Sequence, residues 1–351
     1  MIVVLCNESP WPTRSGGRVR LAGLIGALRE REQTTVVVAV GRGSDAVSPE
    51  AVALPRVGRS KLGALLGAGP RLGRGLLDEA AGKELQRLCR GARAVLVCHS
   101  YLVPLLPALD VPVILDLPDL ECDRQAAAGT VLGRIESWKA RRWEPRAVRT
   151  ATACVCVDEA DAAVVRGWGA NDVLVVPNAA QVPVSPPSPS TGSVLAVADW
   201  RYGPNAQGLR LLAAVGEHLA LPLVVAGRGS EHLPGGLGFV ADLDPLYDRA
   251  AVVVSPVTRG GGTQLKVVEA LARGRVVVTT SYGARSVPTA AREGCVVADS
   301  PEQMAAEIAL LTGDLADRHR RERALRDAPL PRSWSDAAAP LTQLLAAVAG
   351  G

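Results

Sequence analysis

The chain has 351 residues, enough for two domains of ordinary size, and 48% of them are hydrophobic. Aromatic residues make up only 3% and the net charge is +4, which argues against base-stacking platforms and against a strongly basic surface. We therefore expect no nucleic-acid partner.

The opening residues and the cysteines indicate where the protein works. Residues 1–6 lack the basic start and apolar length of a signal peptide, and no stretch predicts a membrane span. The seven cysteines include no C-x-x-C pair. Cys154 and Cys156 share one apolar run, where small core residues are expected. These features predict a soluble, cytoplasmic protein.

Short β-branched runs alternate with helical stretches through the first half of the chain. A helix is expected over about 18–31, and strands are predicted at 2–6, 34–40, 94–98, 113–117, 153–157 and 173–176. This alternation predicts a parallel sheet covered on both faces. Residues 182–193, rich in Pro and Ser, then predict a linker.

The same alternation restarts after the linker. Helices are expected over about 302–326 and 335–348, and strands at 194–198, 223–226, near 238–240, 252–255, 276–279 and 295–297. The fold class is therefore α/β, with two doubly wound parallel-sheet domains at 1–181 and 194–330 and a cleft between them. Ligands bind at the carboxyl ends of the strands in such sheets.

Residues 252–281 combine a buried strand, a glycine loop, a helix and a second strand. Gly261 and Gly262 allow a ligand to approach the backbone closely, and Thr263 can cap the helix. The free N–H groups and the dipole of a helix start attract anions. Lys266 lies in this first turn, where a cation is disfavoured unless it shares an anion, and Glu269 follows one turn later.

Two interpretations of Lys266 and Glu269 are open. They form either an ordinary surface pair or a ligand site in which Lys266 binds phosphate and Glu269 accepts hydrogen bonds from ribose hydroxyls. Because the glycine loop, helix start, cation and acid coincide, we favour a pocket for a nucleotide diphosphate.

The stretch GGGTQLKVVEALARGRVVVTT, residues 260–280, resembles the donor-binding motif of the GT-B retaining glycosyltransferases of family four. In much of that family two glutamates are separated by seven residues. Glu269 matches the second, which binds the donor ribose, and Gly261 stands in place of the first. The resemblance implies two Rossmann-like domains and a C-terminal helix, 331–351, that packs back on the first domain. The missing acid leaves the identity of the donor sugar open.

Further candidates follow the first strand and later strands of the first domain. The segment from Pro12 to Arg20 resembles the family's P-x-x-x-G-G-x-x-R entrance to the active-site cleft. Gly16 and Gly17 are expected to bring backbone N–H groups close to a donor phosphate or an acceptor hydroxyl. Arg18 is a candidate acceptor ligand.

Acidic residues and a histidine follow two other strands. His99 and Asp119 are candidate acceptor ligands, and Asp116 is the candidate catalytic residue at or near the family's His/Asp position. The alternative for the acids, which include Glu121, is helix capping and solvation.

In the second domain, residues 199–205 resemble the W-x-P-N signature of one family branch. Arg201 is a candidate diphosphate ligand, and Asn205 a hydrogen-bonding or capping residue. Val240 lies in the segment whose backbone contacts the donor base in the family. Asp242-Leu-Asp244 mimics a metal-binding motif, but Asp244 before a proline predicts a helix N-cap. We expect no metal site.

Residues 134–149 are basic and carry two tryptophans, which suits a membrane-surface or acceptor-docking helix. The alternative, a solvated helix whose Glu136 and Glu144 pair with arginines, is favoured. Membrane-surface association is therefore possible but not expected.

The resemblance implies retaining transfer of a sugar from a UDP-, dTDP- or GDP-sugar to an acceptor hydroxyl on a natural product, lipid or polysaccharide, without a metal. Two alternatives remain: a nucleotide-sugar epimerase on the same scaffold, and a non-catalytic GT-B subunit that activates a partner.

Overall fold

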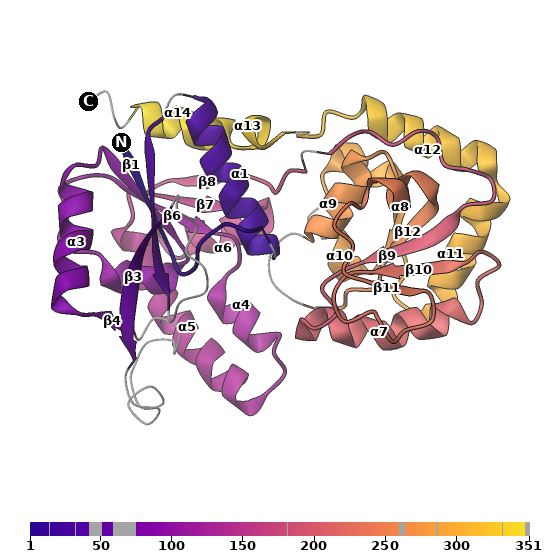
Figure 1. Cartoon of the computed structure of the whole chain (residues 1–351), viewed down its shortest axis with the longest axis horizontal. Coiled ribbons are helices and arrows are strands. Elements are labelled where there is room, and N and C mark those ends of the chain that lie inside the picture. The colour runs from indigo at the N-terminus through magenta and orange to yellow at the C-terminus, as the bar shows by residue number, and fades with distance from the viewer. Residues whose placement is uncertain are drawn as a thin grey trace. The chain divides into compact units, whose positions relative to one another are not determined.

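The computed structural model divides into two compact units, Met1–Asn178 with Trp334–Gly351 and Ala179–Ser333, here called unit 1 and unit 2 (Figure 1). The structure describes residues 1–13, 15–31, 33–41, 51–58, 75–180, 182–259, 264–285, 287–331 and 333–347.

Unit 1 is built on one sheet with the strand order β4-β3-β2-β1-β5-β6-β7-β8. All neighbouring pairs are parallel except β3 with β4, which is antiparallel. The strands are β1 Ile2–Cys6, β2 Thr35–Gly41, β3 Ala51–Gly58, β4 Gly75–Leu77, β5 Ala94–Cys98, β6 Val113–Leu117, β7 Ala153–Cys156 and β8 Val173–Val175.

Helices cover this sheet as expected for a doubly wound fold. They are α1 Gly16–Glu30, α3 Glu79–Arg90, α4 Glu121–Ala126, α5 Val131–Thr150 and α6 Glu159–Gly167, with a 3₁₀ segment η2 at Ser100–Leu105. The sequence patterns predicted the central strands to within one residue. They missed β3 and β4, which lie together at one edge of the sheet.

Unit 2 has the strand order β11-β10-β9-β12-β13-β14, and every pair is parallel. This is the order of a dinucleotide-binding Rossmann sheet, with its reversal between β9 and β12. The strands are β9 Ser193–Val197, β10 Leu223–Ala226, β11 Gly236–Gly238, β12 Ala250–Ser255, β13 Val277–Thr279 and β14 Cys295–Val297. The predicted fold class of two doubly wound parallel-sheet domains is thereby confirmed.

The helices of unit 2 are α7 Gly203–Gly216, α8 Asp244–Arg249, α9 Leu265–Ala272, α10 Ser281–Ala284, α11 Pro301–Gly313 and α12 Leu315–Asp327, with η3 at Thr289–Gly294. The helix predicted over 302–326 is thus two helices. The break lies at Asp314, whose carboxylate accepts the N–H of Asp317 and caps α12.

The last two helices, α13 Trp334–Ala337 and α14 Ala339–Ala347, belong to unit 1. The buried indole of Trp334 packs on α1 at Gly23, where a Cβ atom would lie 2.1 Å from the ring. A residue larger than glycine at position 23 would therefore displace α13.

The core of each unit consists mainly of Val, Leu and Ala on the strands and on the facing sides of the helices. Cys154 and Cys156 are fully buried in the unit 1 core, as predicted from their apolar strand. None of the helices that the structure describes has the length and apolar character to cross a membrane.

Candidate donor and acceptor sites

Arg201 and Lys266 of unit 2 follow the two strands between which the strand order reverses. Strands β9 and β12 are neighbours, so the loop after β9 and the loop after β12 leave the same edge of the sheet side by side. The first loop leads into α7 and the second, rich in glycine, into α9. Gly261, Gly262 and Thr263 of the second loop lie outside the described residues.

Lys266 is the second residue of α9, and a hydrogen bond joins it to α7. Its ammonium donates to Oδ1 of Asn205 at 2.5 Å. Burial lowers the pKa of Lys266 to about 7. No carboxylate pairs with it in the part of the chain that the structure describes. A cation that contacts only a neutral amide at a helix start is uncompensated, and an anionic ligand would stabilise it strongly.

Asn205 is positioned by its own side-chain amide, which donates to the backbone carbonyl of Asp199 at 2.9 Å. Asn205, the last residue of the W-x-P-N signature, therefore orients Lys266 of α9. The sequence did not reveal this role. Arg201 lies in the same loop but is 58% exposed, and its Nε donates to the Asp199 carboxylate at 3.3 Å. It is available at the site's surface rather than fixed within it.

Glu269 lies among buried polar groups. Burial raises its pKa, and the neighbouring Arg273, at 3.5 Å, partly opposes that rise. The Arg273 guanidinium packs over the ring of Tyr247 at 4.5 Å. Within the described chain, the Tyr247 hydroxyl and the Nε and Nη1 atoms of Arg273 are buried without a hydrogen-bond partner. Such groups mark a place where a polar ligand or water completes the structure.

The Asp-x-Asp stretch is structural. Helix α8 begins at Asp244, so the predicted N-cap role of that residue is wrong. The carboxylate of Asp242 instead accepts the N–H of Asp244 at 3.0 Å. Asp244 pairs with Arg273 at 2.8 Å.

Val240 follows β11 and is half-buried, next to the 68% exposed ring of Phe239. The turn before β11 is held by Ser230, whose hydroxyl accepts the N–H of Gly238 at 2.9 Å and donates to the carbonyl of Gly227 at 2.8 Å. Gly227 has a φ of 113°, and a Cβ atom there would lie 1.9 Å from a backbone oxygen. Glycine is therefore required for this turn.

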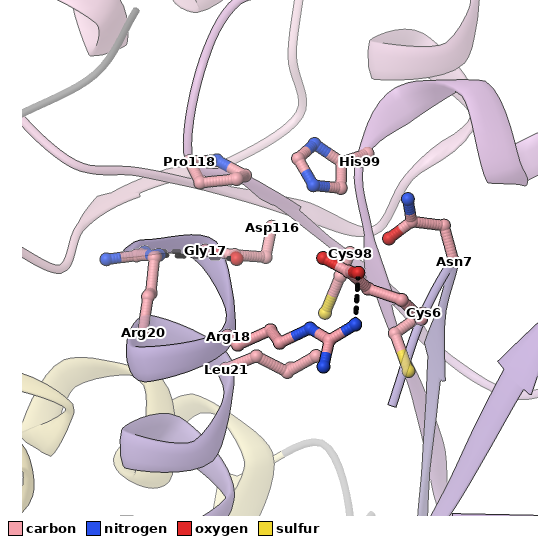
Figure 2. A pocket seen from close by; sticks show the side chains of 11 residues that line it. Cys6, Asn7, Gly17, Arg18, Arg20, Leu21, Cys98, His99, Asp116 and Pro118 are labelled. Carbon is pink, nitrogen blue, oxygen red and sulfur yellow. Dashed lines mark hydrogen bonds and ion pairs between the residues drawn. The ribbon is translucent and has the colours of Figure 1, made fainter. Parts of the chain in front are cut away.

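Unit 1 has a pocket at its own reversal point, between β1 and β5 (Figure 2). Its lining includes Gly17 and Arg18 from the start of α1, His99 after β5, and Asp116 on β6. Ser15 caps α1 by accepting the N–H of Arg18. Gly16 and Gly17 are exposed at this helix start, and apart from the adjoining backbone no atom of the described residues lies within 4 Å of a Cβ built on Gly17. Space for a ligand is therefore present beside this backbone.

Arg18 is a first-turn cation, like Lys266, but it already has an acidic partner. Its guanidinium pairs with Glu8 at 2.7 Å and donates to the carbonyl of Pro12 at 3.3 Å.

Asp116 is fully engaged with Arg20 (Figure 2). Arg20 donates to its two oxygens at 2.7 and 3.3 Å, and both side chains are about 2% exposed. Arg20 also donates to Val176 O at 2.9 Å and to Asn178 Oδ1 at 3.1 Å. This network ties α1 to the end of unit 1, so Asp116 is placed to hold the pocket in shape.

His99 is the unit 1 candidate with the most unusual environment. Its φ of 80° is the one positive value at a non-glycine residue of the described chain. Such strain at a strand end is typical of functional positions. The imidazole stacks on Tyr101 at 5.0 Å. Burial lowers its pKa to about 4, and the charge of Arg124 acts in the same direction. His99 is therefore neutral near pH 7.

The remaining acids separate into different environments. Asp119 is half-buried at the carboxyl end of β6. Glu121 is buried and accepts hydrogen bonds from Arg124 at 2.7 and 2.8 Å. The start of α4 is capped by Glu144 of α5, whose carboxylate accepts the N–H groups of Glu121 and Cys122 at 2.8 and 2.9 Å. A cap supplied by another helix gives no local sequence signal.

Three solved structures of similar architecture define the class of fold. Sucrose-phosphate synthase from Thermosynechococcus elongatus is 14% identical, covers 99% of each chain and has a TM-score of 0.71. Anabaena Alr3699/HepE, in complex with UDP and glucose, is 12% identical over 99% of this chain and 100% of that one, with a TM-score of 0.71. A structure described as trehalose-6-phosphate from E. coli, bound with UDP-2-fluoro glucose, is 12% identical over 98% of this chain and 99% of that one, with a TM-score of 0.64. The chain has the GT-B fold.

The family comparison identifies the second half more closely. Residues 194–314 match the family model of glycosyl transferases group 1. This match includes the glycine motif of residues 260–280 and agrees with the resemblance seen there. No curated protein matches the chain in sequence.

Proposed function

We propose that the protein is a retaining glycosyltransferase that moves a sugar from a nucleotide diphosphate sugar to an acceptor hydroxyl. The observation that carries the proposal is the Lys266 ammonium, which is half-buried at a helix start and, among the described residues, bonded only to the neutral Asn205. A diphosphate supplies the charge that this arrangement lacks.

In the proposed reaction, the bond between the anomeric carbon and the diphosphate oxygen breaks, and a bond to the acceptor oxygen forms on the same face of the sugar. Negative charge gathers on the departing diphosphate while the sugar becomes oxocarbenium-like. Lys266 and the start of α9 stabilise that charge. The acceptor proton passes to the diphosphate, so no separate general base is required.

Glu269 is proposed to accept hydrogen bonds from the donor ribose. The raised pKa of its half-buried carboxyl supports a polar ligand beside it, as do the Tyr247 hydroxyl and Arg273 nitrogens that lack partners among the described residues. Arg201, exposed at the same strand edge, is proposed to contact the diphosphate from the solvent side. The backbone near Val240 is proposed to contact the base.

Unit 1 is proposed to bind the acceptor in the pocket at the start of α1. The neutral imidazole of His99 can both donate and accept a hydrogen bond, which suits a sugar or acceptor hydroxyl. Arg18, which lines the pocket, and Asp119, which follows β6 outside the lining, are proposed further contacts. Gly17 in the lining and the preceding Gly16 offer backbone N–H groups. Asp116 is proposed to position this pocket through Arg20.

UDP is the first nucleoside diphosphate to test, because HepE and the E. coli protein were solved with UDP or a UDP sugar. dTDP- and GDP-sugars are the other candidates. The protein is proposed to act in the cytoplasm without a metal, since Lys266 supplies the positive charge.

The deciding experiment measures binding of UDP, dTDP and GDP, with the matching nucleosides, by titration calorimetry. We expect one diphosphate to bind tightly, and Lys266→Met to weaken it far more than its nucleoside. The 73% exposed Lys83 provides the control Lys83→Met, which should change neither. Equal losses for nucleotide and nucleoside would remove Lys266 from the phosphate.

Turnover assays separate the alternatives. A nucleotide sugar converted to a sugar isomer without acceptor would identify an epimerase. Donor binding without transfer, until a partner protein is added, would identify an activating subunit. For a transferase, the anomeric coupling constant of the isolated product distinguishes retention from inversion.

A further inference from the structure

Helix α5 of unit 1 exposes large apolar side chains along one stripe. Val131, Ile135 and Trp138 are 76%, 44% and 57% exposed. Their spacing of four and three residues places them on the same side of the helix. In the described part of unit 1, only one other large apolar side chain, Val164, is comparably exposed. The exposure is therefore concentrated on α5.

The same face of α5 is positively charged. Arg134 and Arg142 flank the apolar stripe, and Arg146 extends it by one turn; all three are exposed. None forms an ion pair within the described chain. The Arg142 guanidinium instead packs over the Trp138 ring at 3.6 Å. We call these six residues the α5 face: Val131, Arg134, Ile135, Trp138, Arg142 and Arg146.

The acids of α5 are turned inward, which contradicts the expectation of a solvated helix with paired charges. Glu136 is 2% exposed and bonded at 3.2 Å to Lys139, which is also buried. Glu144 is fully buried, where it caps α4. The acids therefore hold the helix in place, and every exposed charge on α5 is an arginine.

The α5 face is presented by a rigid pair of helices. Thr130 caps α5 by accepting the N–H of Gly133 at 3.0 Å. At Gly133 of α5 the two helices approach so closely that a Cβ atom would lie 2.6 Å from the backbone oxygen of Gln125 in α4. Helices α4 and α5 lie side by side below the sheet in Figure 1. The face is thus fixed in its geometry before any partner arrives.

We propose that the α5 face docks unit 1 on an anionic lipid surface. Aliphatic side chains and a tryptophan, flanked by arginines and free of exposed acids, are the composition of a helix that lies in the membrane interface. Trp138 is suited to the headgroup level, and the arginines complement anionic lipid. The arginines favour an anionic occupant, which excludes a second copy of the same basic face. The exposed aliphatic side chains and tryptophan beside them favour a lipid surface over a purely charged partner.

Vesicle flotation tests the proposal with the full-length protein. Vesicles of phosphatidylcholine are compared with vesicles containing about 30% phosphatidylglycerol, at low and high salt. We expect binding to the anionic vesicles alone, and its release by salt, because surface charges are screened.

Two double variants and their controls locate the contact. Arg134→Glu with Arg142→Glu should weaken binding at least twenty-fold, since each arginine contributes about fivefold near an anionic surface. Ile135→Glu with Trp138→Glu should abolish it. Val164→Glu and Arg90→Glu, at exposed positions on α6 and α3, should leave it unchanged. Thermal unfolding curves verify that each variant is folded.

Three outcomes would overturn the proposal: no vesicle binding by the natural chain, equal binding to neutral vesicles, or equal loss in the control variants. A dimer in sedimentation velocity that Trp138→Glu dissociates, without vesicle binding, would assign the face to a second copy instead. Because vesicle binding is measured without donor or acceptor, its failure leaves the proposed transferase activity untouched.

Discussion

Protonation of Lys266 should control how tightly the protein binds a nucleotide diphosphate. Burial lowers its pKa from 10.5 to about 7, so roughly half of the free protein carries the charge at pH 7. A bound diphosphate stabilises the ammonium and returns its pKa toward the ordinary value. Only the protonated form then binds well, and binding above pH 7 takes up a proton.

The magnitude follows from the two pKa values. The protonated fraction of free Lys266 falls from about one half at pH 7 to about one hundredth at pH 9. The affinity for the diphosphate should therefore fall by about fiftyfold over that range, with tenfold per pH unit as the limiting slope. The phosphate adds little, because its second ionisation has a pKa near 6 and is about nine-tenths complete at pH 7.

Calorimetric titrations at several pH values, each in two buffers of different ionisation enthalpy, measure both the affinity and the proton uptake. Lys266→Arg provides the decisive control, since a guanidinium stays charged throughout. Its affinity should be independent of pH between 7 and 9. A flat profile in the natural chain, or the same decline in the arginine variant, would refute a role for Lys266 as a titrating phosphate ligand.

Three other predictions concern neighbouring groups. Asn205→Asp should raise the pKa of the lysine it contacts, flatten the pH profile and weaken diphosphate binding by repulsion, all in the same titration. Asp116→Asn should lower the free energy of unfolding in urea by about 3 kcal/mol, because it leaves a buried guanidinium uncompensated; Glu84→Gln, in an exposed pair, should leave it unchanged. Gly23→Leu should displace α13 and cost about 2 kcal/mol in the same assay, whereas Gly26→Leu, on the same helix with open space around it, should not.

The sequence predicted the central strands of both sheets well, because a strand buried on both faces is a continuous apolar run with one interpretation. It missed β3, whose run Ala51–Gly58 contains a proline and lies toward the edge of the sheet, where such residues are tolerated. It also merged α11 and α12, because the Asp314 cap interrupts a helical pattern that is otherwise continuous.

The candidate site was predictable where local chemistry and a known motif coincide, as at Lys266. It was less so where partners come from distant parts of the chain. Arg20 and Asp116 are 96 residues apart, so nothing near Asp116 shows that its carboxylate is already engaged. The same limit applies to Asn205 and Lys266, which meet only because β9 and β12 are neighbours at the point where the strand order reverses.

The Lys266 ammonium should also make the stability of the ligand-free protein rise with pH, whereas the affinity for the diphosphate falls. The folded state prefers neutral Lys266, whereas the unfolded chain keeps its proton up to a pKa near 10.5. Between pH 7 and 10.5 the unfolded state therefore binds more protons, and this residue makes stability rise with pH. The slope is at most about 1.4 kcal/mol per pH unit, and smaller in practice because the side chain is only partly shielded from water. From pH 7 to 9, the free energy of unfolding should rise more for the natural chain than for Lys266→Met. Over the same range, the stabilisation by added diphosphate should decline. If the free energy of unfolding varied with pH in the same way for both proteins, Lys266 would be solvated in the folded state. Its requirement for an anionic ligand would then have no physical basis.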